Sequence, residues 1–308
     1  MWPQLTSMLQ RPLRKPNREE PKMSGIEISH GCAKGERPLI PQVCRVNKII
    51  QETPDVKSFQ LVTLDGKKPF DCEPGQLGMF GLLAYGECMF VVSAQSDEWV
   101  QFTVKKVGLV TEQLHELCEG DEVSLRGPYG NWWPTDACKG KDMLFIAGGI
   151  GLPPVRSFLL YCLEHREDYG RIDLVYSGSK YDDLVFKEQL FEIWPNEPDM
   201  HVHVSLYRED PRWDGAVAYT APFLETLDLG PEDGNRVAVI CGGPSLSRTC
   251  RESLVKAGFD EGHIITTLEM RMKCGVGKCG RCNMGGHFIC LDGPIFTLEE
   301  IGKMHSDV

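Results

Sequence analysis

Four cysteines near the end of the chain constrain this sequence more than any other feature. Their spacing, C-x4-C-x2-C-x7-C, is that of plant-type ligation of a [2Fe–2S] cluster. Glycines stand between them at positions 275, 277 and 280, where a backbone without a β-carbon folds closely over inorganic sulfurs. The predicted metal ligands are Cys274, Cys279, Cys282 and Cys290.

The residues around these cysteines help to choose between kinds of metal site. A buried cluster carries net negative charge, which nearby basic residues can offset. A structural zinc site usually takes two C-x2-C pairs, and this segment has one. The closely spaced cysteines of bacterial [4Fe–4S] proteins do not match either. The pattern predicts an electron carrier, with a zinc-stabilised binding module as the alternative. The basic residues are Lys273, Lys278 and Arg281.

Length and composition set further bounds. A chain of 308 residues with 42% hydrophobic residues predicts two or three domains with well-buried cores. The formal charge of −11 argues against nucleic acid as a partner. No apolar run approaches the roughly 20 residues of a membrane-spanning helix, so we expect no transmembrane segment. The chain has 13 cysteines, and we expect those outside the motif to be reduced thiols. This predicts a cytoplasmic protein and favours anaerobic metabolism.

The first part of the chain divides into an arm and a β domain. Residues 1–40 are rich in Pro, Lys, Arg and Glu without periodicity, which predicts an N-terminal arm. Residues 41–138 contain short apolar runs separated by turns, the pattern of a small antiparallel Greek-key barrel. The predicted strands are 43–51, 56–63, 78–83, 88–93, 99–107 and 122–126, with one helix at 110–118.

The second part alternates strands with helices over residues 139–266. This alternation predicts a parallel sheet with helices on its faces, an α/β nucleotide-binding domain. Residues 267–308 then form a small C-terminal segment that binds the cluster. The predicted strands are 143–147, 172–177, 201–206 and 236–241, and the predicted helices are 153–165 and 244–257.

Two turns at the carboxyl edge of this sheet are candidate nucleotide sites. Glycines let phosphates approach the backbone, and a helix N-terminus supplies N–H donors and a positive dipole. For either turn, a purely structural role is the alternative. The candidates in the first turn are Gly148, Gly149, Gly151 and Pro153, with Arg156 one helical turn further on as a phosphate ligand. Those in the second turn are Gly242, Gly243 and Pro244.

The barrel domain offers two more candidate turns. The turn before the predicted helix presents N–H groups and a hydroxyl that suit a pyrophosphate. The turn that closes the last strand is either a binding turn or a simple type II turn. Trp132 and Trp133 follow it and suit either stacking on a cofactor or core packing. The candidates are Gly108, Val110 and Thr111 in the first turn, and Gly127 and Tyr129 in the second.

With its barrel, glycine-turned α/β domain and C-terminal cysteines in this order, the chain resembles the ferredoxin–NADP reductase superfamily. More narrowly, it is similar to the electron-transfer subunits of class 1B dihydroorotate dehydrogenase, the gamma subunits of sulfhydrogenases and the iron–sulfur/FAD electron-transfer subunit of anaerobic sulfite reductase. The resemblance runs from about residue 43 to the C-terminus. It rests most on the turns at 108–111, 126–130 and 147–156 and on 268–274.

The resemblance implies an FAD in the barrel, a nicotinamide dinucleotide in the α/β domain and the cluster as the exit for electrons. The stretch expected beside the flavin ring corresponds to Met89, Phe90, Val91 and Ser93, with Val91 where relatives carry a hydroxyl. By the same analogy Cys241 lies near the nicotinamide and is a candidate catalytic residue, with a buried structural thiol as the alternative. Lys180 stands near a position where many relatives have Arg, which favours NAD(H) over NADP.

The sequence offers no separate site for another small substrate, so we expect a partner subunit. Hydrogenase, sulfite reductase, heterodisulfide-reductase-type and dehydrogenase complexes are the candidates. We expect His201 and His203 to be surface or packing residues. The alternative function is a non-catalytic electron relay or scaffold whose flavin or nucleotide site has degenerated.

Overall fold

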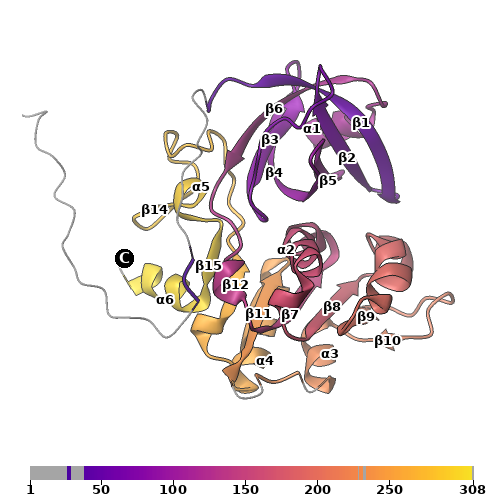
Figure 1. Cartoon of the computed structure of the whole chain (residues 1–308), viewed down its shortest axis with the longest axis vertical. Coiled ribbons are helices and arrows are strands. Elements are labelled where there is room, and N and C mark those ends of the chain that lie inside the picture. Colours follow the sequence, from indigo (N-terminus) through magenta and orange to yellow (C-terminus); the bar gives the residue numbers. More distant parts are fainter. Residues whose placement is uncertain (1–25, 29–37, 228, 232–233, 307–308) are drawn as a thin grey trace, which may run out of the picture.

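The structure is a computed structural model that describes residues 26–28, 38–227, 229–231 and 234–306. Figure 1 shows a β-barrel, an α/β domain beside it, and a C-terminal segment that reaches along both. The fold class predicted from the sequence is confirmed.

The barrel is a closed antiparallel sheet with the strand order β1-β2-β5-β4-β3-β6, in which β6 pairs back onto β1. Alternating apolar residues fill its interior, where the rings of Phe59, Phe80 and Phe102 meet at centroid distances of 5.6 Å. The helix α1 (Leu109–His115) packs Leu114 into this core. The strands are β1 (Gln42–Thr53), β2 (Val56–Thr63), β3 (Leu77–Leu82), β4 (Gly86–Gln95), β5 (Val100–Lys105) and β6 (Glu122–Tyr129).

The α/β domain is built on a seven-stranded sheet with the order β10-β9-β8-β7-β11-β12-β15, parallel except for β15. Figure 1 shows α2 (Leu152–Glu164) between this sheet and the barrel, with α3 (Thr220–Thr226) and α4 (Pro244–Lys256) on the opposite face. The first six strands in chain order are β7 (Asp142–Gly148), β8 (Ile172–Gly178), β9 (Met200–Leu206), β10 (Ala216–Val217), β11 (Arg236–Cys241) and β12 (Ile264–Thr267).

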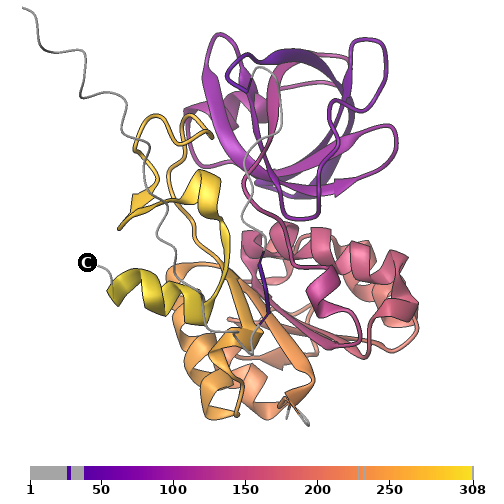
Figure 2. The ribbon, with the colours of Figure 1, turned by 60° about the vertical axis from the view of Figure 1, so that its left-hand side comes forward.

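The C-terminal segment is not a separate layer, because it supplies the last strand of the sheet. β15 (Ile295–Thr297) is fully buried and pairs antiparallel with β12. A run of three residues is too short to stand out in the sequence, which is why the boundary at 267 did not anticipate it. Figure 2 shows this segment running along the side of the sheet toward the barrel. Its other elements are β13 (Asn283–Met284), β14 (His287–Phe288), α5 (Ile289–Asp292) and α6 (Leu298–Ser306).

Residues 26–28 of the predicted N-terminal arm lie on the α/β domain. Ile26 and Ile28 are buried in the core that contains α2, and the N–H of Ile26 donates to the carbonyl of Gly262 at 3.1 Å. This part of the arm therefore contributes to the folded core. Residues 1–25 and 29–37 lie outside the described residues.

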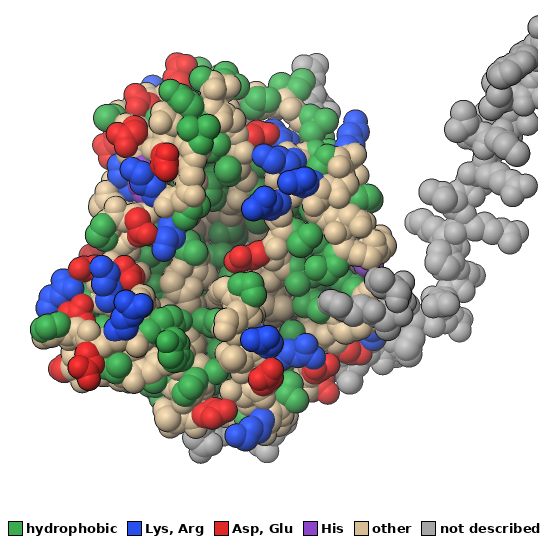
Figure 3. Space-filling model, turned by 180° about the vertical axis from the view of Figure 1, so that it is seen from behind, with side chains coloured by type: hydrophobic (Ala, Val, Ile, Leu, Met, Phe, Trp, Pro, Cys, Tyr) green, Lys and Arg blue, Asp and Glu red, His purple; other side chains and the backbone are tan. Residues whose placement is uncertain are grey.

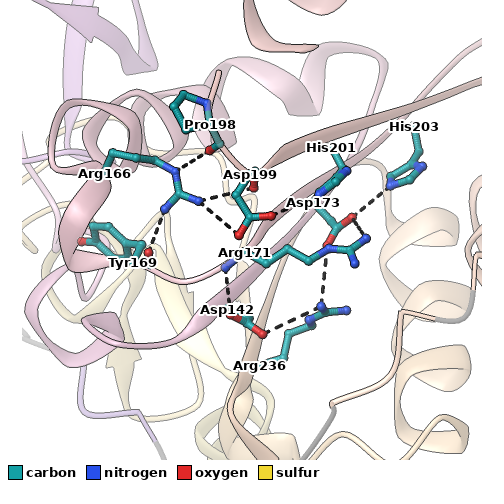
Figure 4. Close-up of polar contacts among 10 residues, drawn as sticks. All are labelled: Asp142, Arg166, Tyr169, Arg171, Asp173, Pro198, Asp199, His201, His203 and Arg236. Atoms are coloured by element: carbon teal, nitrogen blue, oxygen red, sulfur yellow. Dashed lines mark hydrogen bonds and ion pairs between the residues drawn. The ribbon is translucent and has the colours of Figure 1, made fainter. Parts of the chain in front are cut away.

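A network of ion pairs joins the strands at the sheet edge opposite the glycine turns (Figure 4). The carboxylate of Asp173 is fully buried and contacts Arg171 at 2.8 Å, His203 at 3.0 Å and Arg236 at 3.7 Å. Burial by itself would raise the pKa of Asp173, but the hydrogen bonds from His203 and Arg171 outweigh it and lower that pKa. His203 therefore has a structural partner, as expected for a packing residue.

Candidate functional site

A cavity of about 1100 Å³ lies between the α/β domain and the barrel. Figure 3 shows the molecule hollowed between these two domains. The turn after β7 lines the cavity with Gly148, Gly149 and Ile150, and the turn after β11 lines it with Gly243 and Pro244. Both turns lie at the carboxyl ends of neighbouring parallel strands, where ligands of such sheets bind.

The glycines of the first turn differ in what surrounds the position of their missing β-carbon. A β-carbon on Gly151 would lie 2.3 Å from the carbonyl oxygen of Cys241, so this glycine allows α2 to start against the end of β11. A β-carbon on Gly148 would lie 2.2 Å from the side chain of Leu246. Gly149 has φ +52° and open space around its missing β-carbon. Gly149 is thus the glycine that leaves room in the cavity. Gly151 is required because its neighbour is backbone, whereas the neighbour of Gly148 is the end of a flexible side chain.

The second turn leads directly into α4. Gly243 is the residue before the helix and has φ −59°, and Pro244 occupies the first helical position. No atom lies within 4 Å of a β-carbon placed on Gly243, whereas one on Gly242 would contact Leu246 at 3.0 Å. The backbone is open to the cavity at Gly243, next to the N-terminus of a 13-residue helix.

Side chains of both charges line the far part of the cavity. Lys180 and Asp183 come from the loop after β8, and Asp55 and Lys105 come from the barrel. Lys105 and Asp55 pair with each other at 3.3 Å. The aromatic rings of Tyr207 and Tyr219, which also line the cavity, lie 4.9 Å apart. Sequence reasoning missed these tyrosines because they stand in a loop without a motif.

A smaller cavity of about 320 Å³, which we call the apolar slot, lies beside the first one. Its barrel wall is formed by Met89, Phe90 and Val91 of β4, and its other walls by Ile150, Pro153, Pro154, Cys241 and residues 267–270. Ile150 lines both the slot and the cavity of about 1100 Å³, which we call the nucleotide cavity because both candidate nucleotide turns line it. The predicted stretch 89–91 and the predicted Cys241 thus meet across one space.

Polar groups in the slot are few. The thiol of Cys241 lies 3.2 Å from the hydroxyl of Thr267. Burial raises the pKa of Cys241 to about 12, and the nearby carboxylate of Glu269 adds to the increase, so this thiol is protonated at neutral pH. Partial desolvation also raises the pKa of Glu269. Glu269 lines the slot but was absent from the sequence candidates, although its place five residues before the first metal-ligand cysteine could have drawn attention to it.

The structure gives Arg156 a different role from the phosphate ligand that the sequence suggested. Its guanidinium donates to the carbonyl of Ser93 at 3.1 Å and to the side chain of Gln189 at 2.7 Å, and it lies 4.4 Å from the ring centre of Phe186. Burial lowers the pKa of Arg156 to about 10. Arg156 therefore joins the barrel to the α/β domain and is absent from the lining of the nucleotide cavity.

Ser93 and Thr111 likewise have internal partners for their hydroxyls. The Ser93 hydroxyl bonds to the hydroxyl of Thr103 at 2.9 Å inside the barrel. The Thr111 hydroxyl accepts from the N–H groups of Val107 and Gly108 and donates to the carbonyl of Gly108, which fixes the start of α1. Neither hydroxyl is free for a cofactor in this arrangement. Gly108 and Val110 line neither cavity.

Trp133 and Tyr129 are also structural in this arrangement. Trp133 stacks on Phe158 of α2 at 5.8 Å and donates to the carbonyl of Pro154 at 3.1 Å, so it packs the junction between the domains at the edge of the slot. Tyr129 is fully buried, and Gly275 of the cysteine loop lies against its ring. Tyr129 therefore supports the cysteine loop, Gly127 packs against the carbonyl of Leu77 and the ring of Phe70, and neither lines the slot.

Residues 274–290, which we call the cysteine loop, hold the four cysteines, three in irregular backbone and Cys290 in α5. Backbone N–H groups of this segment point at the sulfurs of Cys274 and Cys290. The N–H groups of Val276 and Lys278 donate to Cys274 at 3.4 and 3.3 Å, and that of Gly277 donates to Cys290 at 3.3 Å. Burial acts against the thiolate, but these and other backbone N–H groups lower the pKa of Cys274 to about 7. The loop thus stabilises negative charge on sulfur, which a metal cluster ligand requires.

The four thiols lie close together. The thiol of Cys274 interacts with that of Cys279, and the thiol of Cys282 with that of Cys290, which Cys274 also influences. Among the residues that the structure describes, no three His, Cys, Asp or Glu side chains converge as the ligands of one metal ion would. Two pairs of thiols suit two irons better than a single tetrahedral zinc.

Arg126 of β6 ties this loop to the barrel. Its guanidinium donates to the carbonyls of Cys274 at 2.8 Å and Lys273 at 3.0 Å, and to the hydroxyl of Tyr129 at 2.9 Å. On the other side it forms an ion pair with Glu87 of β4. Sequence reasoning treated Arg126 only as part of a turn, because its partners lie about 150 residues away in the chain.

Comparison with known proteins agrees with this geometry. Residues 145–252 match the family model "Oxidoreductase NAD-binding domain", and residues 269–302 match "Iron-sulfur cluster binding domain of dihydroorotate dehydrogenase B". Sulfhydrogenase 1 subunit gamma of Pyrococcus furiosus is 33% identical over 260 residues, covering 82% of this chain and 88% of the relative. A probable dihydroorotate dehydrogenase B electron transfer subunit of Methanocaldococcus jannaschii is 28% identical, with coverages of 87% and 96%.

Solved structures share the fold. The NADH-dependent reduced ferredoxin-NADP oxidoreductase has a TM-score of 0.65 and 22% identity, covering 83% of this chain and 88% of that one. The cytochrome b5 reductase domain of Ulva prolifera nitrate reductase has a TM-score of 0.62 and 20% identity, covering 74% and 98%. Fold and site define an oxidoreductase with an NAD-binding domain and an iron–sulfur domain. Within this class, the chain belongs to the family of electron-transfer subunits that contains the sulfhydrogenase gamma and dihydroorotate dehydrogenase B proteins.

The family resemblance expected from the sequence is thereby confirmed. In the part of the chain that the structure describes, no helix combines the length and apolar character needed to cross a bilayer.

Proposed function

We propose that this chain passes electrons between NAD(H), an FAD, a [2Fe–2S] cluster and a partner enzyme of a multi-subunit complex. One observation carries the proposal, namely the order of three sites in space. The nucleotide cavity and the apolar slot share Ile150 as a common wall. Met272 also lines the slot, and it stands two residues before Cys274, the first cysteine of the cysteine loop.

The slot fits a flat ring system such as the isoalloxazine of FAD. Its walls are mainly apolar side chains, with Val91 and Met89 on the barrel side and Pro153 and Pro154 on the other. A bound flavin supplies the exchange between the two-electron chemistry of a nicotinamide and the one-electron chemistry of a cluster. This chain contributes polar groups to that space, among them a protonated thiol at Cys241 and a carboxyl at Glu269, beside Thr103 and Thr267.

The nucleotide cavity favours NAD(H) over NADP(H). The carboxylate of Asp183 lines the cavity next to Lys180, and a carboxylate there opposes the negative charge of a 2′-phosphate. Lys180 offers a single charge without the bidentate geometry of an arginine. The glycines at 149 and 243 leave the backbone open toward the phosphates of the dinucleotide.

The two pairs of thiols support a [2Fe–2S] cluster, since each iron then takes two of the four cysteines. We propose that the partner is a hydrogenase, a sulfite reductase, a heterodisulfide-reductase-type enzyme or a dehydrogenase. The names of the relatives, subunits of sulfhydrogenase and dihydroorotate dehydrogenase B, support such a complex. The twelve cysteines that the structure describes are free thiols, which supports a reducing compartment, the cytoplasm.

The experiment uses the full chain, purified without oxygen and with its iron restored. We expect about one FAD per chain, bleaching of the flavin by NADH, and the electron paramagnetic resonance (EPR) signal of a reduced cluster. Reduction by NADPH should be slower. A reducible cluster without flavin would indicate the non-catalytic relay, and a colourless zinc protein would indicate the binding module.

A pair of cysteine variants separates the cofactors. Cys279→Ser should abolish the EPR signal and leave the FAD content nearly unchanged, because the slot and the cysteine loop are different parts of the fold. Cys118→Ser, which removes another exposed thiol, should change neither. Loss of FAD and cluster together in Cys279→Ser would contradict this division.

A further inference from the structure

The loop that holds the four cysteines is the basic face of an acidic protein. The chain carries a formal charge of −11, but between Glu269 and Asp292 it has no Asp or Glu. Four cations lie in this interval, and all four are exposed. We call them the basic rim: Arg271, Lys273, Lys278 and Arg281.

The basic rim has no acidic partner among the residues that the structure describes. No described residue forms an ion pair with any of the four cations, whereas Lys67, Lys139 and Lys303 each pair with a carboxylate. Other exposed cations without a described ion pair, such as Lys48 and Arg248, stand far apart in the chain, and within the described ranges only the rim gathers four of them in one short segment. In Figure 3, Lys and Arg side chains gather at the upper right, on the side of the molecule where the C-terminal segment lies. These cations are therefore available to a second molecule.

The surroundings of the basic rim resemble a docking surface. Cys279, one of the four thiols, is exposed in its midst. Val276 and Phe288 are partly exposed apolar side chains of the same segment. An apolar centre with a charged rim is the usual anatomy of a protein interface.

We propose that the basic rim binds the acidic face of a redox protein whose one-electron acceptor lies behind that face. The inference rests on the function proposed above and specifies the partner's surface. In each transfer, one electron leaves the reduced cluster and enters the acceptor, so the cluster is oxidised, the acceptor is reduced, and no bond or proton changes place.

Because this chain has a net negative charge, an acidic partner should approach it in one preferred orientation. An acidic protein is repelled by a surface with an excess of carboxylates and is attracted most strongly at the basic rim, where four cations lie in a segment without a carboxylate. Electrostatics therefore bring the partner to the one place where Cys279 is exposed. A basic partner would instead be attracted to many places away from the cluster.

The test measures electron transfer from the full chain, loaded with its cofactors and reduced by NADH, to two acceptor proteins of opposite charge. The probes are an acidic [2Fe–2S] ferredoxin and a basic cytochrome c. We expect faster reduction of the ferredoxin, with a rate that falls as salt is added. The double variant K278E/R281E should lower the second-order rate for ferredoxin by about tenfold or more at low salt. The control K67E/K256E, with the same change in net charge, should lower it much less.

Two further measurements keep the outcomes distinct. Flavin bleaching by NADH and the cluster EPR signal, both measured without an acceptor protein, test the proposed function. Their absence in the unaltered chain would overturn the proposed function rather than the docking surface. The midpoint potential of the cluster separates docking from charge compensation. The docking proposal is overturned if the change in midpoint potential of K278E/R281E fully explains its slower reduction of ferredoxin. It is also overturned if the control variant slows that reduction equally. Preference for cytochrome c at low salt would also overturn it.

Discussion

The guanidinium of Arg126 donates a hydrogen bond of 2.8 Å to the carbonyl of Cys274, so a barrel strand holds the first residue of the cysteine loop. The same guanidinium reaches the carbonyl of Lys273 at 3.0 Å and pairs with Glu87. The slot lies between these parts, with β4 on one side and Met272 on the other. One buried arginine thus sets the distance between the barrel wall of the slot and the cysteines.

Replacing this arginine should loosen the loop. Arg126→Met should lower the free energy of unfolding by about 3 kcal/mol, because removing one partner of a largely buried ion pair leaves the other uncompensated. We also expect less iron per chain after desalting. Arg45→Met is the matched control, since Arg45 on the neighbouring strand makes, among the residues that the structure describes, a single long hydrogen bond of 3.5 Å to the carbonyl of Leu64. Iron content and unfolding like those of the unaltered chain would contradict a positioning role for Arg126.

Arg156 offers a test between two roles. The structure predicts that Arg156→Met destabilises the protein by about 1–3 kcal/mol, since the carbonyl of Ser93 loses its buried donor. Affinity for NADH should stay close to that of the unaltered chain, because Arg156 does not line the nucleotide cavity. Thermal unfolding and NADH titration measure the two effects. Normal stability with a large loss of NADH affinity would show that the guanidinium binds phosphate after all.

Two glycines at the nucleotide cavity should respond differently to an added methyl group. Gly151→Ala should cost about 1–3 kcal/mol of stability, because the new β-carbon would overlap the carbonyl of Cys241. Gly243→Ala should leave stability unchanged, since nothing lies within 4 Å of its β-carbon, and should weaken NADH binding by narrowing the cavity. Equal unfolding temperatures for the two variants would contradict this account of the turns.

The buried network of Figure 4 predicts a pH-dependent contribution to stability. Hydrogen bonds from His203 and Arg171 lower the pKa of Asp173 in spite of its burial. A lowered folded-state pKa stabilises the protein above the unfolded pKa of about 4, and this stabilisation is lost as the pH falls through the folded-state value. Asp173→Asn should therefore cost about 3 kcal/mol at pH 7 and progressively less below pH 4, in urea unfolding at a series of pH values.

Asp199→Asn is the control for this network. Asp199 is exposed and has φ +51°, a conformation that asparagine tolerates equally well. Its ion pairs with Arg166 and His201 lie at the surface, so their loss should cost about 0.5 kcal/mol. A constant difference between Asp173→Asn and the unaltered chain from pH 7 to pH 3 would show that the charge of Asp173 is not what stabilises the network.

Elements with strong local patterns could be predicted from the amino-acid sequence. The strands at 56–63 and 236–241 lie where the apolar runs predicted them, because burial and β-propensity act along a continuous stretch. The spacing of the four cysteines likewise anticipated a loop whose N–H groups face sulfur. Spacing, glycines and apolar runs are local features, and their consequences are local.

Which polar groups are free to bind a ligand depends on how the chain folds in three dimensions. Arg156, Ser93 and Thr111 had the right chemistry for a cofactor, but each is held by internal partners. Conversely, Arg126 supports the cysteine loop through residues 147 and 148 positions away. A hydrogen bond between segments that are distant in the sequence depends on the path of the chain in three dimensions. A local sequence pattern does not predict that path. The cysteines could be recognised from the sequence, and their placement beside the slot could not.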